Sequence, residues 1–164
     1  MRGALQAVCL TATLGAGAGA GVVAADDTPV RFPDGAATFQ ANCAVCHRAN
    51  GAGTPGLAPP VRTFAPKFIA TPDGRSQLAM TVLYGMYGDI VVDERHYNFK
   101  MPEFSRFDDA TIAAVLNYVA FDLGGAPPQT PVLAASDIAE QRAHVVDGDA
   151  VRQHRALTIG TLTP

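Results

Sequence analysis

Three side chains able to hold a cofactor fall within five residues, in the sequence Cys43-Ala-Val-Cys46-His47. Two thiols separated by two residues can each add across one vinyl group of a porphyrin, and both reach the same edge of the ring. The histidine that follows is carried beneath the iron, where its imidazole can be the proximal ligand. The spacing therefore predicts one covalently attached haem, held by Cys43 and Cys46, with His47 as an iron ligand.

Other uses of a cysteine pair fit this chain less well. A structural zinc site needs four ligands, usually from two such pairs, and the remaining cysteine is Cys9, in an apolar N-terminal stretch. A thioredoxin-like dithiol opens a helix in a βαβ context, and no such pattern flanks residues 43–47. A disulfide between cysteines this close in a helix has poor geometry. Haem attachment is the favoured interpretation.

Length and composition indicate a single small domain. The chain has 164 residues, with 16 glycines, 12 prolines and no tryptophan, which predicts a loop-rich protein with a small core. A covalently held macrocycle would supply apolar surface that such a domain lacks. The formal net charge is −3 at pH 7, and without a basic excess a nucleic acid is not an expected partner.

The N-terminal segment is typical of an export signal. No charged residue lies between Arg2 and Asp26, and Val23-Ala24-Ala25 puts small residues at the −3 and −1 positions. We expect a signal peptide over residues 1–25, cleaved after Ala25, and export to the periplasm. The uncharged stretch is also long enough to span a bilayer, so membrane attachment is expected only if the leader is not cleaved.

The first helix after the leader is expected to carry the cysteine motif. Asp34 belongs to the residue types that cap helix N-termini, and the sequence after it predicts a helix over about residues 35–47. Phe39, Cys43 and Cys46 fall at i, i+4 and i+7, so they share one helical face. This spacing puts the Phe39 ring beside the edge of the haem.

A loop is expected over residues 51–60, where glycine and proline dominate. Glycine permits positive φ and close backbone approach, whereas proline stiffens the chain, and a loop against the flat face of a haem needs both. A ligating histidine usually donates its other ring N–H to a carbonyl or carboxylate. We expect the carbonyl of Pro59 to accept this hydrogen bond from His47.

A second helix is predicted over residues 74–84. Asp73 can cap its N-terminus and Gly85 can end it. Residues 86–100 then form a long connection that contains a short extended piece at 90–92. Long loops in compact domains tend to be functional, so we expect this connection to deliver a ligand.

The clearest helical pattern in the chain begins after Asp108, the expected N-cap. Its apolar residues recur with the spacing of one helix face, namely Ile112, Val115, Leu116, Val119 and Leu123. Gly124 and Gly125 are expected to end this helix. The elements together predict an all-α fold.

The C-terminal residues resemble an appendage. We expect a stiff linker over 126–131 and two short helices near 137–146 and 148–157, with Asp137 and Glu140 forming a capping box. Because these helices carry few large apolar residues, they cannot form a core of their own. We therefore expect the tail to contact a partner protein rather than the haem.

A second iron ligand is expected from a methionine or histidine outside the motif. Met101 is favoured because a thioether is a soft, neutral donor and because Pro102 biases the preceding residue toward an extended conformation. Met86 is the second choice. The other candidates in the mature chain are Met80, His96, His144 and His154.

Four stretches in order resemble the class I monohaem c-type cytochrome family: FQANCAVCHRANGAGTPGLAPPV, VLYGMYG, YNFKMPEF and DDATIAAVLNYVAF. The resemblance covers about residues 33–124. It implies a small all-α haem-crevice fold with His47 and Met101 as axial ligands. It also implies electron transfer between partner proteins rather than turnover of a substrate, so the chain is not expected to be an enzyme.

The resemblance also suggests how the chain is organised and which proteins it meets. We expect a signal peptide (1–25), a haem domain (26–125) and a linker with a helical extension (126–164). The tail sequence DIAEQRAHVVDGDAVRQHRAL is similar to extensions on cytochrome subunits that serve bacterial periplasmic dehydrogenases. Such a dehydrogenase is the expected electron donor, and an oxidase or another cytochrome is the expected acceptor.

The alternative function is a haem enzyme or a gas-binding haem protein. In either of these Met101 is not bound and the sixth position of the iron is open. With both His47 and Met101 bound, the iron has no position free for a substrate. Spectra distinguish the two, because only an open site gives a high-spin spectrum that changes when cyanide is added to the oxidised protein or carbon monoxide to the reduced protein.

Overall fold

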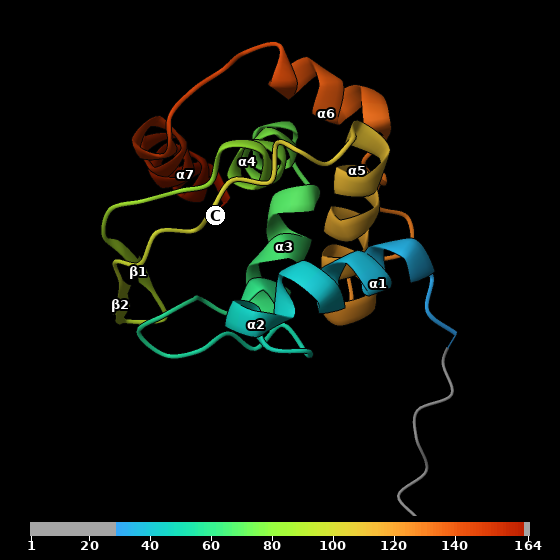
Figure 1. Ribbon diagram of the computed structural model, residues 1–164, viewed down its shortest axis with the longest axis horizontal. Coiled ribbons are helices and arrows are strands. Elements are labelled where there is room, and N and C mark those ends of the chain that lie inside the picture. Colours follow the sequence, from blue (N-terminus) through green and yellow to red (C-terminus); the bar gives the residue numbers. More distant parts are fainter. Residues whose placement is uncertain (1–28, 163–164) are drawn as a thin grey trace, which may run out of the picture.

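The computed structural model describes residues 29–162, so the expected signal peptide and Cys9 lie outside the described residues. Helices make up most of this part of the chain, and the expected all-α fold is confirmed (Figure 1). In chain order the elements are α1 (Pro33–Asn42), α2 (Ala44–His47), α3 (Val61–Ile69), α4 (Pro72–Tyr84), β1 (Ile90–Val92), β2 (Arg95–Tyr97), α5 (Asp109–Asn117), the π-helix η1 (Tyr118–Leu123), α6 (Ala135–Arg142) and α7 (Gly148–Leu162).

The start of α1 differs from the sequence prediction. Pro33 occupies the first turn and Asp34 follows it within the helix, so Asp34 is not the cap. Proline suits this position because its fixed φ is helical and its missing N–H has no partner to lose. The two backbone amides before the helix, of Arg31 and Phe32, instead donate to the carboxylate of Asp122, at 2.7 and 3.1 Å.

The expected single helix over residues 35–47 is in fact two. The helix is interrupted at Cys43, so α1 ends at Asn42. A single helical turn, α2, then contains Cys46 and His47. Phe39 remains on the inner face of α1, where it is buried and its ring lies 5.6 Å from that of Tyr118.

α5 and η1 form one continuous helix that contacts α1, α3 and α6. Asp108 caps α5 as predicted, since its carboxylate accepts a hydrogen bond from the Thr111 amide at 2.7 Å. The helix does not stop at Asn117 but widens into the π-helix η1, which ends at Gly124. The apolar stripe predicted from the sequence forms the centre of the core, where Ile112, Val115, Leu116 and Val119 are all buried.

α3 was not anticipated from the sequence. Pro60 precedes it and Pro66 lies inside it, and proline in a helix interior normally disrupts the hydrogen-bond ladder. Packing compensates for that loss, because the apolar side of α3 (Ala65, Phe68 and Ile69) is buried, and α3 contacts α4 and η1.

α4 begins and ends close to the predicted positions. Its cap is Thr71, whose Oγ1 accepts a hydrogen bond from the Gly74 amide at 3.1 Å, while Asp73 lies in the first turn. Gly85, with φ +69°, follows the last residue of the helix. The predicted extended piece is β1, which pairs antiparallel with β2 through a turn whose two residues, Asp93 and Glu94, both have positive φ.

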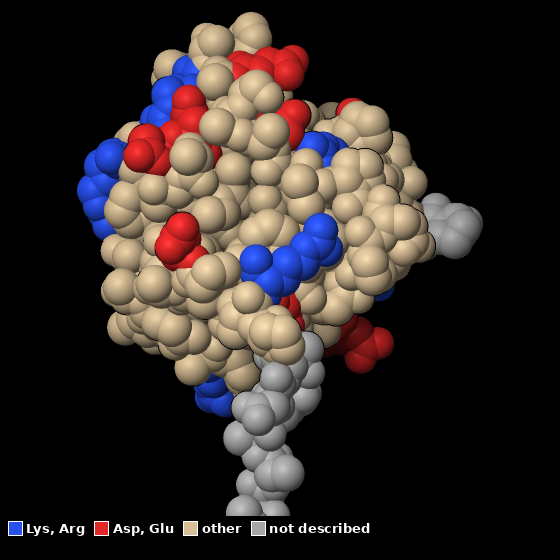
Figure 2. All heavy atoms as spheres, turned by 90° about the vertical axis from the view of Figure 1, so that its right-hand side faces the viewer, with Lys and Arg blue, Asp and Glu red and all other residues tan. Residues whose placement is uncertain are grey.

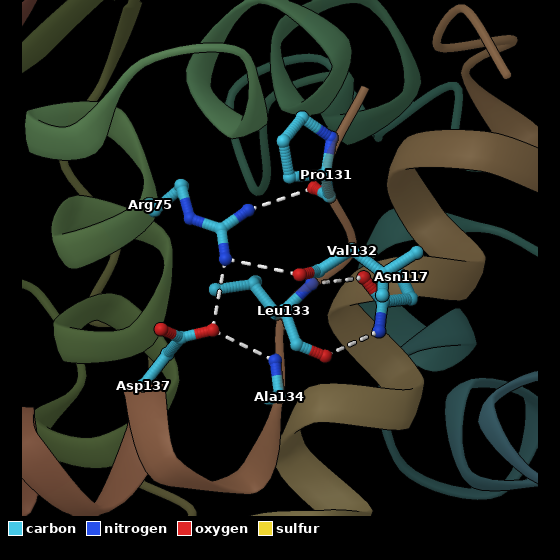
Figure 3. Close-up of polar contacts among 7 residues, drawn as sticks. All are labelled: Arg75, Asn117, Pro131, Val132, Leu133, Ala134 and Asp137. Atoms are coloured by element: carbon cyan, nitrogen blue, oxygen red, sulfur yellow. Dashed lines mark hydrogen bonds and ion pairs between the residues drawn. The ribbon is translucent and has the colours of Figure 1, made fainter. Parts of the chain in front are cut away.

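The C-terminal tail is folded back onto the preceding part of the chain, whereas the sequence predicted an appendage that contacts a partner protein. Leu133 and Ile138 are buried in the main core. The buried amide of Asn117 bonds both backbone groups of Leu133 at 2.9 Å (Figure 3). Arg75 donates to the carbonyls of Pro131 and Val132, and pairs with the Asp137 carboxylate at 2.8 Å.

The caps and contacts of the last two helices also differ from the prediction. Asp137 lies in the first turn of α6 and accepts a hydrogen bond from the Ala134 amide at 2.7 Å, so it is not the cap that Glu140 would complement. The Tyr84 hydroxyl donates to two carbonyls near the end of α6, and α7 packs against α4.

Within the described part of the chain, none of the helices combines the length and the hydrophobicity needed to cross a membrane.

Figure 2 shows the right-hand side of the molecule as drawn in Figure 1. On this face acidic and basic side chains are dispersed among uncharged residues rather than gathered into one basic patch.

Candidate functional site

One cavity gathers the five residues that the sequence predicted for the cofactor site. It lies between α2, α3, α4 and the segment 97–104, and most of its wall is apolar. Cys43, Cys46, His47, Pro59 and Met101 all line it. They come from three segments that are far apart in the sequence, so only the tertiary fold brings them together.

Cys43 lies between α1 and α2, and Cys46 lies within α2. The Cys43 carbonyl accepts hydrogen bonds from the amides of Cys46 (3.2 Å) and His47 (3.0 Å), which defines the single turn of α2. Both cysteines are half-buried and line the cavity. Burial, together with the charge of the neighbouring Cys46, raises the pKa of the Cys43 thiol to about 11.

One ring nitrogen of His47 forms a hydrogen bond within the protein. It is 8% exposed, and its Nδ1 lies 2.9 Å from the Pro59 carbonyl oxygen. Because a carbonyl can only accept, Nδ1 carries the proton and Nε2 keeps a free lone pair. Burial lowers the pKa of His47 despite the opposing effect of the bond to Pro59, which favours the neutral imidazole that binds metals.

The loop after His47 supports the turn that carries it. The Gly53 amide donates to the His47 carbonyl at 2.9 Å, and the Thr54 hydroxyl donates to the Cys46 carbonyl at 2.9 Å. Thr54 and Ala58 pair as a short bridge, which leads the chain to Pro59. Gly53 has φ +74°, and a Cβ there would lie 2.6 Å from the Ala58 carbonyl oxygen.

The two methionines considered as ligands are neighbours in space. Met86 and Met101 form an isolated antiparallel bridge, with backbone N–O distances of 3.2 and 2.8 Å. Both side chains line the cavity. Gly85 makes this bridge possible, since a Cβ there would lie 2.4 Å from the Met101 carbonyl oxygen. Geometry alone therefore leaves both methionines as candidates.

The remaining candidate ligands do not line the cavity. Met80 is buried within α4. His96 is exposed on β2, 2.8 Å from Asp89, and His144 is exposed after α6. His154 lies on α7 with its Nδ1 2.7 Å from the Gln77 side chain. Within residues 29–162, no group of three or more His, Cys, Asp or Glu side chains is arranged to hold a metal ion.

Sequence reasoning missed two cations on the cavity wall, Lys100 and Arg155. Lys100 adjoins the predicted ligand Met101, so proximity in sequence could have indicated it. Arg155 comes from the tail. Val151, Arg155 and Thr158 are spaced i, i+4 and i+7, so the sequence could have shown that they share one helix face. Both of those neighbours are buried in α7.

The chemistry of the lining fits a haem. Two thiols lie beside an imidazole with one free nitrogen, and thioethers are available across the cavity. The apolar wall suits a flat macrocycle, and the two cations suit its carboxylates. An all-α fold around such a cavity defines a protein that encloses a covalently attached haem.

Comparison with known proteins agrees with this definition. The family model for cytochrome c matches residues 32–120. Cytochrome c-552 of Thermus thermophilus is 42% identical over 93 residues, which cover 57% of this chain and 70% of that protein. A second cytochrome c-552, from a particular strain of Thermus thermophilus, has the same identity over 93 residues, with 57% of this chain and 62% of that protein covered.

The chain belongs to the cytochrome c family, and its features are those of a class I c-type cytochrome. Its cofactor is therefore covalently bound haem c, as the motif predicted. The protein is an electron carrier that acts with redox partner proteins, and it is not an enzyme. The family match ends at residue 120, so it does not extend to the tail.

Proposed function

We propose that this protein is a periplasmic electron carrier with one haem attached to Cys43 and Cys46, and with His47 and Met101 as axial ligands. The observation that carries the proposal is the meeting of these four residues on the wall of one apolar cavity. Haem supplies one-electron exchange at its iron. The protein residues hold it, exclude water and set the ease of reduction.

Each residue in the proposed site has a separate physical task. The thiols anchor the ring beside α2. The Pro59 carbonyl orients His47 and raises its basicity as a ligand. Met101 supplies a neutral thioether, which raises the reduction potential relative to a second imidazole. The buried aromatic and aliphatic wall lowers the local dielectric and keeps solvent from the iron.

The route and partners are part of the same proposal. We propose that residues 1–25 are a signal peptide removed after Ala25, and that residues 26–125 form the haem domain. The donor is a periplasmic dehydrogenase, and the acceptor is an oxidase or another cytochrome. Residues 126–162 of the extension pack against the rest of the described chain, so its contribution to partner binding would use the outer surfaces of α6 and α7.

The ligand assignment is tested by comparing Met101→Ala with Met86→Ala. Both side chains line the same cavity from opposite strands of one bridge, so each variant is a control for the other. Met101→Ala should keep covalent haem, lose the sulfur-to-iron absorption band near the red end of the oxidised spectrum, bind cyanide or carbon monoxide, and have a lower potential. Met86→Ala should retain the band.

Two results would contradict the proposal in different ways. Exchange of the two phenotypes would assign Met86 as the ligand. A wild-type protein that already binds carbon monoxide and lacks the band would indicate an open sixth position, which is the alternative function. Extraction with acid-acetone provides the check on attachment, because haem bound through two thioethers remains with the polypeptide.

A further inference from the structure

We propose that Arg155 of α7 binds a propionate of the haem, so that the C-terminal extension completes the cofactor site. This inference rests on the proposed haem site, and it replaces the expectation that the tail contacts only a partner. It is carried by the charge of the cavity wall, by the surroundings of Arg155 and by the packing of α7.

The charge of the cavity wall is unbalanced. Among the described residues that line it, Lys100 and Arg155 are cationic, and none is Asp or Glu. Haem has two propionate groups, which are anionic at neutral pH. A carboxylate is the natural partner of a guanidinium, because the planar fork can donate two parallel hydrogen bonds. The cavity therefore presents the charge that the cofactor needs.

Arg155 also differs from the other arginines of the tail. Arg142 pairs with Asp109 at 2.8 Å, and Arg152 pairs with Asp149 at 2.6 Å. Arg155 is half-buried, and it makes no hydrogen bond or ion pair with any other described residue. Burial lowers the pKa of its guanidinium. A partly buried cation without a partner is unfavourable, and a propionate in the cavity would remove that cost.

The packing of α7 fixes where Arg155 points. Val151 and Thr158, one turn on either side, are 0% and 2% exposed against the body of the protein. His154 is joined to Gln77 of α4, and Gln77 itself lines the cavity. These contacts leave Arg155 on the same inward face of the helix.

The position of α7 in the fold agrees with the geometry of haem. The propionates lie on the edge of the macrocycle opposite the two vinyl groups, and the thiols that react with the vinyls are on and beside α2. In Figure 1, α7 lies beside α4 in the upper left of the molecule, and α2 lies at its lower edge. This separation is the one expected if α2 binds the vinyl edge of the ring and α7 contacts a propionate.

The experiment compares four holoproteins: wild type, Arg155→Gln, Arg155→Lys and Arg152→Gln. Arg152 is the matched control, since it lies one turn earlier on α7, carries the same charge and does not line the cavity. The reduction potential of each is measured against pH, with the visible spectrum as a check that the ligands are intact. The other titratable groups on the wall (Lys100, Tyr97 and the motif residues) are common to all four.

Arg155→Gln should have a lower potential than wild type at neutral pH, because loss of the cation disfavours the more electron-rich reduced haem. Its potential should also rise more steeply on acidification. Without the guanidinium the propionate pKa is higher, so protonation enters the measured range. Arg155→Lys should restore most of the wild-type behaviour, and Arg152→Gln should resemble wild type throughout.

Equal small shifts in Arg155→Gln and Arg152→Gln, with no change in pH dependence, would overturn the proposal. If Arg155→Gln does not fold, the crystal structure of the wild-type holoprotein decides, because the guanidinium must lie within hydrogen-bonding distance of a propionate oxygen. Failure of the proposed function is distinguishable: wild type itself would then lack covalent haem or the sulfur-to-iron band.

Discussion

At the scale of single residues, the position of His47 depends on the loop of residues 51–60, which bonds both its ring and its backbone. The Pro59 carbonyl accepts from the imidazole, and the Gly53 amide donates to the backbone carbonyl of His47. Gly53 is the residue that lets these two segments approach, because its missing Cβ leaves room for the Ala58 and Pro59 backbone. Small shifts here would move the imidazole relative to the cavity.

Gly53→Ala is expected to destabilise the protein more than Gly56→Ala. Both glycines have nearly the same positive φ, +74° and +75°, but only at Gly53 would a Cβ collide with backbone. The left-handed conformation alone costs an alanine about 1–2 kcal/mol. Urea unfolding of the holoproteins measures the difference. Equal losses of unfolding free energy would show that the close approach at Gly53 has no energetic consequence.

At the scale of elements, the crossing of α1 over α5 and η1 positions the motif. Phe39 packs on Tyr118, and the guanidinium of Arg31 lies 4.4 Å from the centre of the Phe121 ring. The helices meet so closely at Gly35 that a Cβ there would lie 2.1 Å from the Ala114 carbonyl oxygen. Because α1 leads directly into Cys43, the angle of this crossing determines where the thiols face.

Gly35→Ala is expected to destabilise the fold by about 1–3 kcal/mol, because the added methyl overpacks the helix crossing. Gly160→Ala is the matched control, a helical glycine of α7 with no atom within 4 Å of the added Cβ. Alanine is the better helix former by about 1 kcal/mol, so this variant should be as stable as wild type or more so. Thermal unfolding of both variants tests the contrast. A neutral Gly35→Ala would contradict the close crossing.

At the scale of the whole molecule, the tail is part of the folded domain. Arg75, Asn117 and Tyr84 of the haem domain bond the backbone or side chains of residues 131–142. Ile138 and Val151 are 0% exposed. The tail thus adds apolar burial to the core, and through Arg155 of α7 it contributes to the wall of the cavity.

Ile138→Ala is expected to lower the free energy of unfolding by about 2–5 kcal/mol, because it leaves a cavity in the core. Val145→Ala, at a position 82% exposed after α6, should change it by less than about 0.5 kcal/mol. Chemical denaturation of the holoproteins measures both. If Ile138→Ala is also neutral, the tail is an appendage in solution, as its sequence alone suggested.

Several features could be predicted from the sequence because local chemistry decides them. The spacing of Cys43, Cys46 and His47 has few uses other than haem attachment, and the family comparison confirms the cofactor. The helix after Asp108 combines a side-chain cap with a regular apolar stripe, so its start and its buried face were both predicted. The stop at Gly85 was predicted for a similar reason, since glycine tolerates the positive φ after a helix end.

Other features depend on contacts between distant segments, which spacing does not reveal. α3 forms despite Pro66 because its apolar face is buried, and proline rules describe only the local cost. Asp122 bonds the backbone of Arg31 and Phe32, about 90 residues earlier in the sequence, and Asn117 bonds the backbone of Leu133, so no short-range pattern marks them. The five predicted site residues line one cavity. Met86 lines it because of its bridge to Met101 beside Gly85, and Arg155 lines it because α7 packs against α4.

The sequence by itself determined the cofactor and the amphipathic helices, because covalent chemistry and hydrophobic periodicity act over a few residues. The tertiary structure decided where the tail lies and which charges face the haem cavity. The reason is that burial is a property of the whole fold. The few apolar residues of the tail cannot form a core alone, yet Leu133, Ile138 and Val151 are sufficient when a core to join already exists.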